Sequence, residues 1–179
     1  MGQIKEPKRV TPVASVFTGN ETLFAAIEAV LTSRLGLCIY KSERLPFVHT
    51  TYYEAEMGPN LTRIIFAFEA LIDPGRLPAL KNWSNRLEDN WRTDGRRQVN
   101  IDLGYVSLAK VVLATTKDHA HRLYLGEGIF GEVTLYYCGG EFQAWPWTYP
   151  DYASPSYRKL FNTVRSLHRR QIKVLESQI

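Results

Sequence analysis

Basic side chains crowd one part of the chain, residues 92–122. Only three acidic residues accompany them there, Asp94, Asp102 and Asp118. The basic residues are Arg92, Arg96, Arg97, Lys110, Lys117 and Arg122. Arginine presents a rigid fork of donors that matches phosphate and carboxylate oxygens. This composition indicates either a binding site for an anion or a solvated surface with internal ion pairs.

We predict the anion site, with Arg96, Arg97 and Arg122 converging on it. Lys110 interrupts an apolar run, so its ammonium group either reaches the protein edge or points into a polar site. The predicted ligand is a phosphate-bearing small molecule or a nucleotide. Its predicted binding residues are Tyr52, Arg96, Arg97, Lys110, Lys117 and Arg122.

A second group of polar residues lies in the segment 43–60, which has no clean periodicity and is typical of an exposed functional connection. Glu54 and Glu56 can serve as general acid and base if burial separates their pKa values. We expect them, with Tyr52, to face the basic cluster. The alternative is an acidic loop that packs through its tyrosines. The sequence does not determine whether residues 50–58 and 94–122 meet.

His119 and His121 are two residues apart, which on a strand places both side chains on one face. Such a pair can ligate one metal ion, and this is the basis of a metal-dependent enzyme as a further hypothesis. The alternative is a pair of ordinary surface or core histidines. No cofactor is identified by any other pattern.

Basic residues also recur in the last predicted helix. They are Arg158, Lys159, Arg165, Arg169, Arg170 and Lys173. A basic helix face can bind RNA or a protein partner, and RNA binding of this kind weakens steeply with salt. A solvated face explains the same pattern. The sequence does not indicate an oligomeric state.

Several familiar chemistries are excluded by spacing. The spacing Gly126 to Gly131 resembles a P-loop, but Glu132 and Val133 stand where Lys and Ser or Thr are required. The glycines at 126, 128 and 131 also match a dinucleotide fingerprint, yet they lie between two predicted strands rather than a strand and a helix. There is no G-x-S-x-G motif. The two cysteines, Cys38 and Cys138, are predicted to be free thiols.

Length and composition favour one globular domain. The chain has 179 residues, 45% of them hydrophobic, and a net charge of +4. Residues 1–12 are polar with two prolines, which indicates a flexible N-terminal arm ahead of a single domain over 13–179. No segment is long and apolar enough for a membrane helix, and no signal pattern is present, so we expect a cytoplasmic protein without membrane contact.

The predicted elements alternate in type along the chain. Strands are expected over 13–18, 37–40, 61–72, 98–115 and 141–145, with a short helix as the alternative near 107–114. Two further strands are expected within 121–137, around a Gly-rich turn at Gly126 and Gly128. Helices are expected over 21–35, 77–91 and from Ser154 or Pro155 to the end, the last with a buried stripe at Tyr157, Leu160, Phe161, Val164, Leu167 and Val174. This order predicts an α+β fold: a mostly antiparallel, mixed sheet, helices packed on one face, and a long C-terminal helix.

Four blocks of sequence resemble a known family. They are TTYYEAEMG (50–58), DGRRQVNIDLGY (94–105), AKVVLATTKDHAHRLYLGEGIFGEVTL (109–135) and PWTYPDY (146–152). In this order they resemble the bacterial and archaeal domain-of-unknown-function 4416 family, whose members are of similar length. The resemblance implies a single-domain prokaryotic protein and no particular activity. Some members carry a GTP-binding label, which the missing P-loop lysine does not support.

Overall fold

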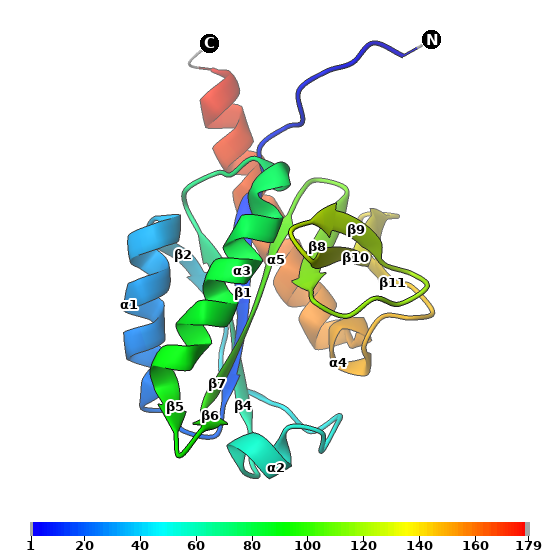
Figure 1. Ribbon diagram of the computed structural model, residues 1–179. Coiled ribbons are helices and arrows are strands. Elements are labelled where there is room, and N and C mark those ends of the chain that lie inside the picture. The colour runs from blue at the N-terminus through cyan, green and yellow to red at the C-terminus, as the bar shows by residue number, and fades with distance from the viewer. Residues whose placement is uncertain (1, 178–179) are drawn as a thin grey trace.

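The computed structural model describes residues 2–177, and Figure 1 shows a twisted sheet with helices around it. The strands are β1 (Thr11–Thr18), β2 (Cys38–Lys41), β3 (Leu45–Pro46), β4 (Thr62–Phe68), β5 (Arg92–Thr93), β6 (Arg96–Arg97), β7 (Val99–Val106), β8 (Lys110–Thr115), β9 (Leu123–Gly126), β10 (Ile129–Cys138) and β11 (Glu141–Ala144). The helices are α1 (Leu23–Leu35), α2 (Glu54–Met57), α3 (Leu77–Glu88), α4 (Pro150–Ala153) and α5 (Pro155–Glu176). The predicted α+β class and single domain are confirmed.

The main sheet runs in the order β11-β10-β8-β7-β1-β4-β2, with β3 beside β4 and β9 beside β10. Every strand pair that the structure describes is antiparallel. Because β4 lies between β1 and β2, and β1 lies between β4 and β7, the segment from β1 to β7 forms two interleaved split β-α-β units. Strands β8 to β11 then extend the sheet beyond β7.

Helices cover both faces of the sheet, so the prediction of helices on one face is wrong. Ala14 of β1 packs with Ile27 of α1 and Leu80 of α3, whereas the neighbouring Val13 packs with Phe161 of α5 on the opposite face. Strand β1 is buried at every position for this reason. A largely apolar sequence without strict alternation, as in β1 and β4, is the expected pattern for a strand covered on both sides.

Local signals account for most element ends. Gly36 ends α1 as predicted, and the Ser154 side chain caps α5 by accepting a hydrogen bond from the Tyr157 backbone N–H. Helix α1 begins at Leu23. Just before it, the Asn20 side-chain oxygen accepts a hydrogen bond from the Thr22 backbone N–H at 3.2 Å. Residues 110–115 form a strand rather than the alternative helix, since they pair with β7 and β10.

The buried stripe of α5 departs from the prediction near its end. Val174 is 57% exposed, and His168 and Ile172 are buried instead. Leu167 is only half-buried. The physical reason is visible in Figure 1, where the last turns of α5 extend past the end of the sheet. Val174 lies in this part of the helix, where it is mostly exposed.

The chain ends add little to the core. Residues 2–9 are exposed and form no helix or strand, and β1 begins at Thr11, two residues before the predicted domain boundary. Met1, Gln178 and Ile179, which belong to the predicted arm and domain, lie outside the described residues. Both cysteines are free thiols, as predicted. Within residues 2–177 no helix combines the length and the apolar character that crossing a membrane requires.

Buried His168 makes the stability of the fold depend on pH. Its Nδ1 lies 3.0 Å from the Thr11 hydroxyl, and burial, followed by the charge of Arg165, lowers its pKa to about 4. An unfolded histidine titrates near pH 6.5. Below that pH the unfolded chain takes up a proton that the folded chain refuses, so stability is lost as the pH falls towards 4.

We expect this histidine to lower the free energy of unfolding by about 2 kcal/mol between pH 7.5 and pH 5. Urea denaturation at the two pH values measures the loss. The His168→Gln variant keeps a polar side chain but cannot titrate, so its stability should change less over the same interval. An equal change in the variant and the native protein would contradict the assignment.

Candidate functional site

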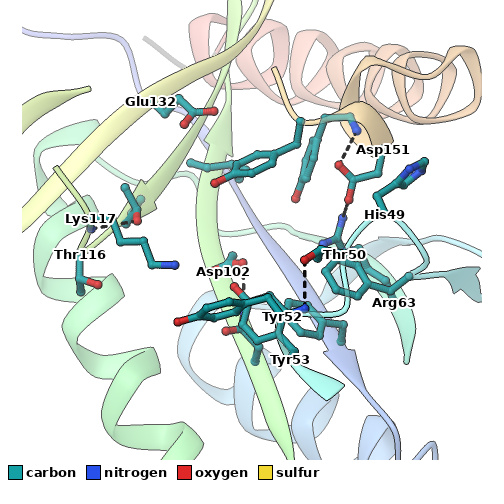
Figure 2. Close-up of a pocket in the computed structure, with 18 of the residues that line it drawn as sticks. His49, Thr50, Tyr52, Tyr53, Arg63, Asp102, Thr116, Lys117, Glu132 and Asp151 are labelled. Atoms are coloured by element: carbon teal, nitrogen blue, oxygen red, sulfur yellow. Dashed lines mark hydrogen bonds and ion pairs between the residues drawn. The ribbon is translucent and has the colours of Figure 1, made fainter. Parts of the chain in front are cut away.

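A cavity of about 610 Å³ lies at one end of the sheet, a size typical of small-molecule sites. It is lined by the ends of β1, β4, β7, β8 and β10, by α3 and α4, and by the loop after β3. Figure 2 shows side chains from these separate segments pointing into a common space. The charged residues of the lining are Arg63, Lys81, Glu88, Arg97, Asp102, Lys117, Arg122, Glu132 and Asp151.

The cavity exists because β7 and β8 separate. They pair only from Gly104 to Val106 of β7. Gly104 permits their close approach, since a Cβ atom there would lie 2.2 Å from the carbonyl oxygen of Val112. Ahead of Gly104, the described sheet gives the outer edge of β7 no strand partner. The Ile101 peptide on that edge must therefore find hydrogen bonds elsewhere.

Helix α3 supplies those hydrogen bonds through charged side chains. The Glu88 carboxylate accepts a hydrogen bond from the Ile101 N–H at 2.8 Å, and the Lys81 ammonium donates to the Ile101 carbonyl at 2.9 Å. Both side chains are almost fully buried. Burial is the main influence on the pKa of Glu88 and raises it. The positive charge of Lys81 acts in the opposite direction. A buried acid and a buried base thus stand beside the open edge of β7.

Lys81 extends this arrangement to Asp102. Its ammonium donates to Asp102 Oδ1 at 3.0 Å, and the Asn100 amide donates to Oδ2 at 2.9 Å. Each carboxylate oxygen of Asp102 therefore has one fixed donor. Tyr53 lies nearby, and burial, followed by the negative charge of Asp102, raises the pKa of its phenol to about 12.

Arg97 connects Glu88 to helix α2. Its guanidinium donates to both oxygens of Glu56, at 2.9 and 2.7 Å, and to Glu88 at 3.2 Å. The hydrogen bond from Arg97 is the main cause that lowers the pKa of Glu56. The carboxylates of Glu56 and Glu88 thus compensate the positive charge of Arg97. The donors of this arginine bind these residues of the protein itself.

Arg122 and Arg63 also have carboxylate partners. Arg122 donates to Glu132 at 2.9 Å, to the Lys117 carbonyl at 3.1 Å and to the Tyr149 hydroxyl at 3.1 Å. Arg63 forms an ion pair with Asp151, and its guanidinium lies 4.4 Å from the centre of the Phe47 ring. These contacts hold the loop before β9 and the helix α4 in place around the cavity.

Lys117 differs from these cations. It is exposed at the cavity mouth, and no carboxylate of residues 2–177 lies within ion-pair distance of its ammonium. The ammonium lies 4.9 Å from the centre of the Tyr52 ring, a weak cation–π contact across the mouth. Tyr52 is itself 70% exposed. An incoming anion can reach both residues.

Comparison with known proteins identifies the family. The model of the family described as "Domain of unknown function (DUF4416)" matches residues 8–168. The chain belongs to this family. No curated protein and no solved structure matched the chain. The family membership confirms the resemblance found in the four sequence blocks, which contain much of the cavity lining.

The residues that the sequence indicated in this DUF4416 chain fall into two sets. Tyr52, Arg97, Lys117 and Arg122 line the cavity, so residues 50–58 and 94–122 do meet. Over residues 2–177 the lining leaves out Arg96 and Lys110. Arg96 is exposed in the β5–β6 hairpin, and Lys110 begins β8 at the end of that strand far from the cavity. The predicted convergence of Arg96 with Arg97 and Arg122 is therefore wrong.

The predicted acid–base pair does not reach the cavity. Among the described residues its lining includes neither Glu56, which is held by Arg97, nor Glu54, which is exposed on α2. The general acid–base hypothesis requires burial of these carboxyl groups, but Glu54 is exposed and Glu56 is only partly buried. Two aromatic residues at helix α4, Tyr149 and Tyr152, line the cavity as well.

His119 and His121 lie in the loop before β9 rather than on a strand. Their rings stack at 5.9 Å, and His121 Nε2 lies 3.1 Å from Glu132. Over the described part of the chain, no group of three or more His, Cys, Asp or Glu side chains is placed to hold a metal ion. The residues present therefore do not support the metal hypothesis.

The basic face of α5 is partly used within the fold. Arg158 donates to the Phe142 carbonyl at 3.4 Å, and Arg165 donates to the Leu108 carbonyl at 2.7 Å and lies 3.4 Å from the Tyr137 ring centre. The remaining basic residues are exposed: Lys159, Arg169, Arg170 and Lys173. RNA binding by these four stays a prediction.

Sequence reasoning missed most of the buried charges: Arg63, Lys81, Glu88, Glu132 and Asp151. One signal was available. Arg63 and Glu132 interrupt apolar strand runs, as Lys110 does, but they lie inside their strands rather than at an end. A charge in the middle of a buried strand must meet a partner or a polar site. Lys81 and Glu88 carry no such signal, because charges are ordinary on a helix.

Replacing Arg97 should show how much its ion pair with buried Glu88 contributes to stability. We expect Arg97→Met to lower the free energy of unfolding by about 2–3 kcal/mol, because a buried carboxylate loses its cation. Glu88→Gln in the Arg97→Met background removes that charge but keeps an oxygen for the Ile101 N–H. The second substitution should therefore recover part of the loss. Urea denaturation of the four proteins measures the coupling, and strictly additive effects would argue against a direct Arg97–Glu88 interaction.

Proposed function

We propose that this chain binds a small molecule carrying a phosphate group in the cavity, and that Lys117 holds the phosphate. The observation that supports this proposal is that Lys117 differs from the other cations of the lining in its partners. Arg63, Lys81, Arg97 and Arg122 each have a carboxylate partner. Lys117 is left with only the Tyr52 ring among the described residues.

The charge of the lining limits the ligand. The charged residues of the lining, five basic (Arg63, Lys81, Arg97, Lys117, Arg122) and four acidic (Glu88, Asp102, Glu132, Asp151), have a net charge of +1. A phosphate monoester suits one available ammonium. A triphosphate would bring several further negative charges close to the buried carboxylates, and this repulsion costs free energy in a partly enclosed site where water screens charges less.

Hydroxyl groups at the mouth complement Lys117. Thr50, Thr115 and Thr116 all belong to the lining, and the Thr115 hydroxyl accepts a hydrogen bond from the Lys117 backbone N–H at 3.2 Å. Hydroxyl donors satisfy those phosphate oxygens that a single ammonium cannot reach. Figure 2 shows Thr116 and Lys117 on the same side of the space, across from Thr50 and Tyr52.

A thermal-shift experiment tests the proposal on the whole chain. The probes are glycerol 3-phosphate, ribose 5-phosphate and adenosine 5′-monophosphate, each paired with its parent alcohol. A ligand that binds only the folded state raises the melting temperature. We expect at least one phosphate ester to do so where its parent alcohol does not. No response to any phosphate ester would contradict the proposal.

Substitution of Lys117 then locates the phosphate. Lys117→Ala should weaken binding of the active ester by roughly tenfold or more, since one charge-assisted contact is worth about 1.5–3 kcal/mol. Lys110→Ala is the matched control, because it removes an exposed lysine at the end of β8 far from the cavity, whereas Lys117 follows the other end of that strand. Titration calorimetry measures both affinities. Equal effects of the two substitutions would place the phosphate elsewhere.

A further inference from the structure

We infer that the ligand also carries two neighbouring hydroxyl groups, and that Asp102 receives both of them. This inference rests on the proposed phosphate site and names the second half of the ligand. The class is therefore a phosphate monoester with a vicinal diol, as found in sugar phosphates and in ribonucleotides. The argument comes from the exposure, the partners and the charge of Asp102.

Asp102 is the acidic side chain of the lining that is open to a ligand. Its side chain is 35% exposed, whereas the side chains of Glu88, Glu132 and Asp151 are 5%, 3% and 7% exposed. Strand β7 places Asp102 where β8 has moved away, so the carboxylate faces the cavity. Figure 2 shows it in the same space as Lys117 and the two tyrosines of the loop after β3.

The partners of Asp102 leave room for further donors. A carboxylate has about four acceptor positions, two on each oxygen. Lys81 occupies one position on Oδ1 and Asn100 occupies one on Oδ2. Each oxygen keeps a free position, and the two oxygens are held side by side by these fixed donors. Two adjacent hydroxyl groups match this arrangement, one proton to each oxygen.

Charge favours hydroxyl groups over an ammonium group as the donors. Lys81 already compensates the charge of Asp102, and the lining as a whole carries one excess positive charge. An ammonium group on the ligand would add a second cation beside Lys81. Neutral hydroxyl groups add none, and a hydrogen bond to a charged acceptor is stronger than one between neutral groups.

The two tyrosines provide an apolar wall next to Asp102. The rings of Tyr52 and Tyr53 meet at right angles, with centres 5.0 Å apart. Tyr52 is exposed, and Tyr53 is half-buried against Phe17 and Phe47. The C–H face of a sugar ring can pack on such aromatic surfaces while its hydroxyl groups point to Asp102. A diol at Asp102 and a phosphate at Lys117 thus lie in one continuous site.

Matched ligand pairs test the inference without altering the protein. Ribose 5-phosphate is compared with 2-deoxyribose 5-phosphate, and adenosine 5′-monophosphate with its 2′-deoxy form, by titration calorimetry on the intact chain. Loss of one hydroxyl should weaken binding by roughly tenfold or more. Discrimination in the first pair identifies a sugar phosphate as the ligand source. Discrimination in the second pair alone identifies a ribonucleotide.

A variant then assigns the discrimination to Asp102. Asp102→Asn should bind the hydroxy and deoxy forms with similar affinity, whereas Asp118→Asn, an exposed control outside the lining, should keep the difference. Circular dichroism confirms that both variants are folded. Equal binding of hydroxy and deoxy forms by the native protein would overturn the diol inference and leave the phosphate site standing. Failure of every phosphate ester to bind would overturn both.

Discussion

The open edge of β7 at Ile101 is the constraint on which the site depends. A buried peptide group must be hydrogen-bonded, and here β8 has turned away from its neighbour. Glu88 and Lys81 of α3 take the place of a strand. Their charges then require partners, which are Arg97 and Asp102. The gap between the strands and the charged groups around it therefore have a common origin.

Such an arrangement is a poor way to gain stability. Four carboxylates of the lining each pair with a cation, and three of these carboxylates are almost fully buried. Removing charges from water costs several kcal/mol per ion, and well-packed apolar residues are often as stable or more so. The core on both faces of the sheet already packs without them. We take this concentration of buried charge around a cavity as support for a binding role.

The sequence predicts the fold class and most elements, because apolar periodicity, Gly36 and Ser154 act locally. It does not show that helices cover both faces, although the largely apolar sequences of β1 and β4 contain that information. For the site, it indicates Tyr52, Arg97, Lys117 and Arg122 correctly as cavity residues. It misplaces Arg96 and Lys110, because position along a strand decides which end of the sheet a side chain occupies. The partners Lys81 and Glu88 depend on how α3 crosses β7, which residue spacing does not encode.

Backbone NMR of the isotope-labelled chain, titrated with a phosphate ester that raises its melting temperature, tests the central claim most directly. The account predicts chemical-shift changes that cluster at residues 49–53, 100–102 and 115–117, the segments that surround the cavity mouth. These segments come from distant parts of the chain, so their joint response requires a ligand between them. Changes confined to the exposed basic residues of α5, or no changes at any ligand concentration, would contradict the account.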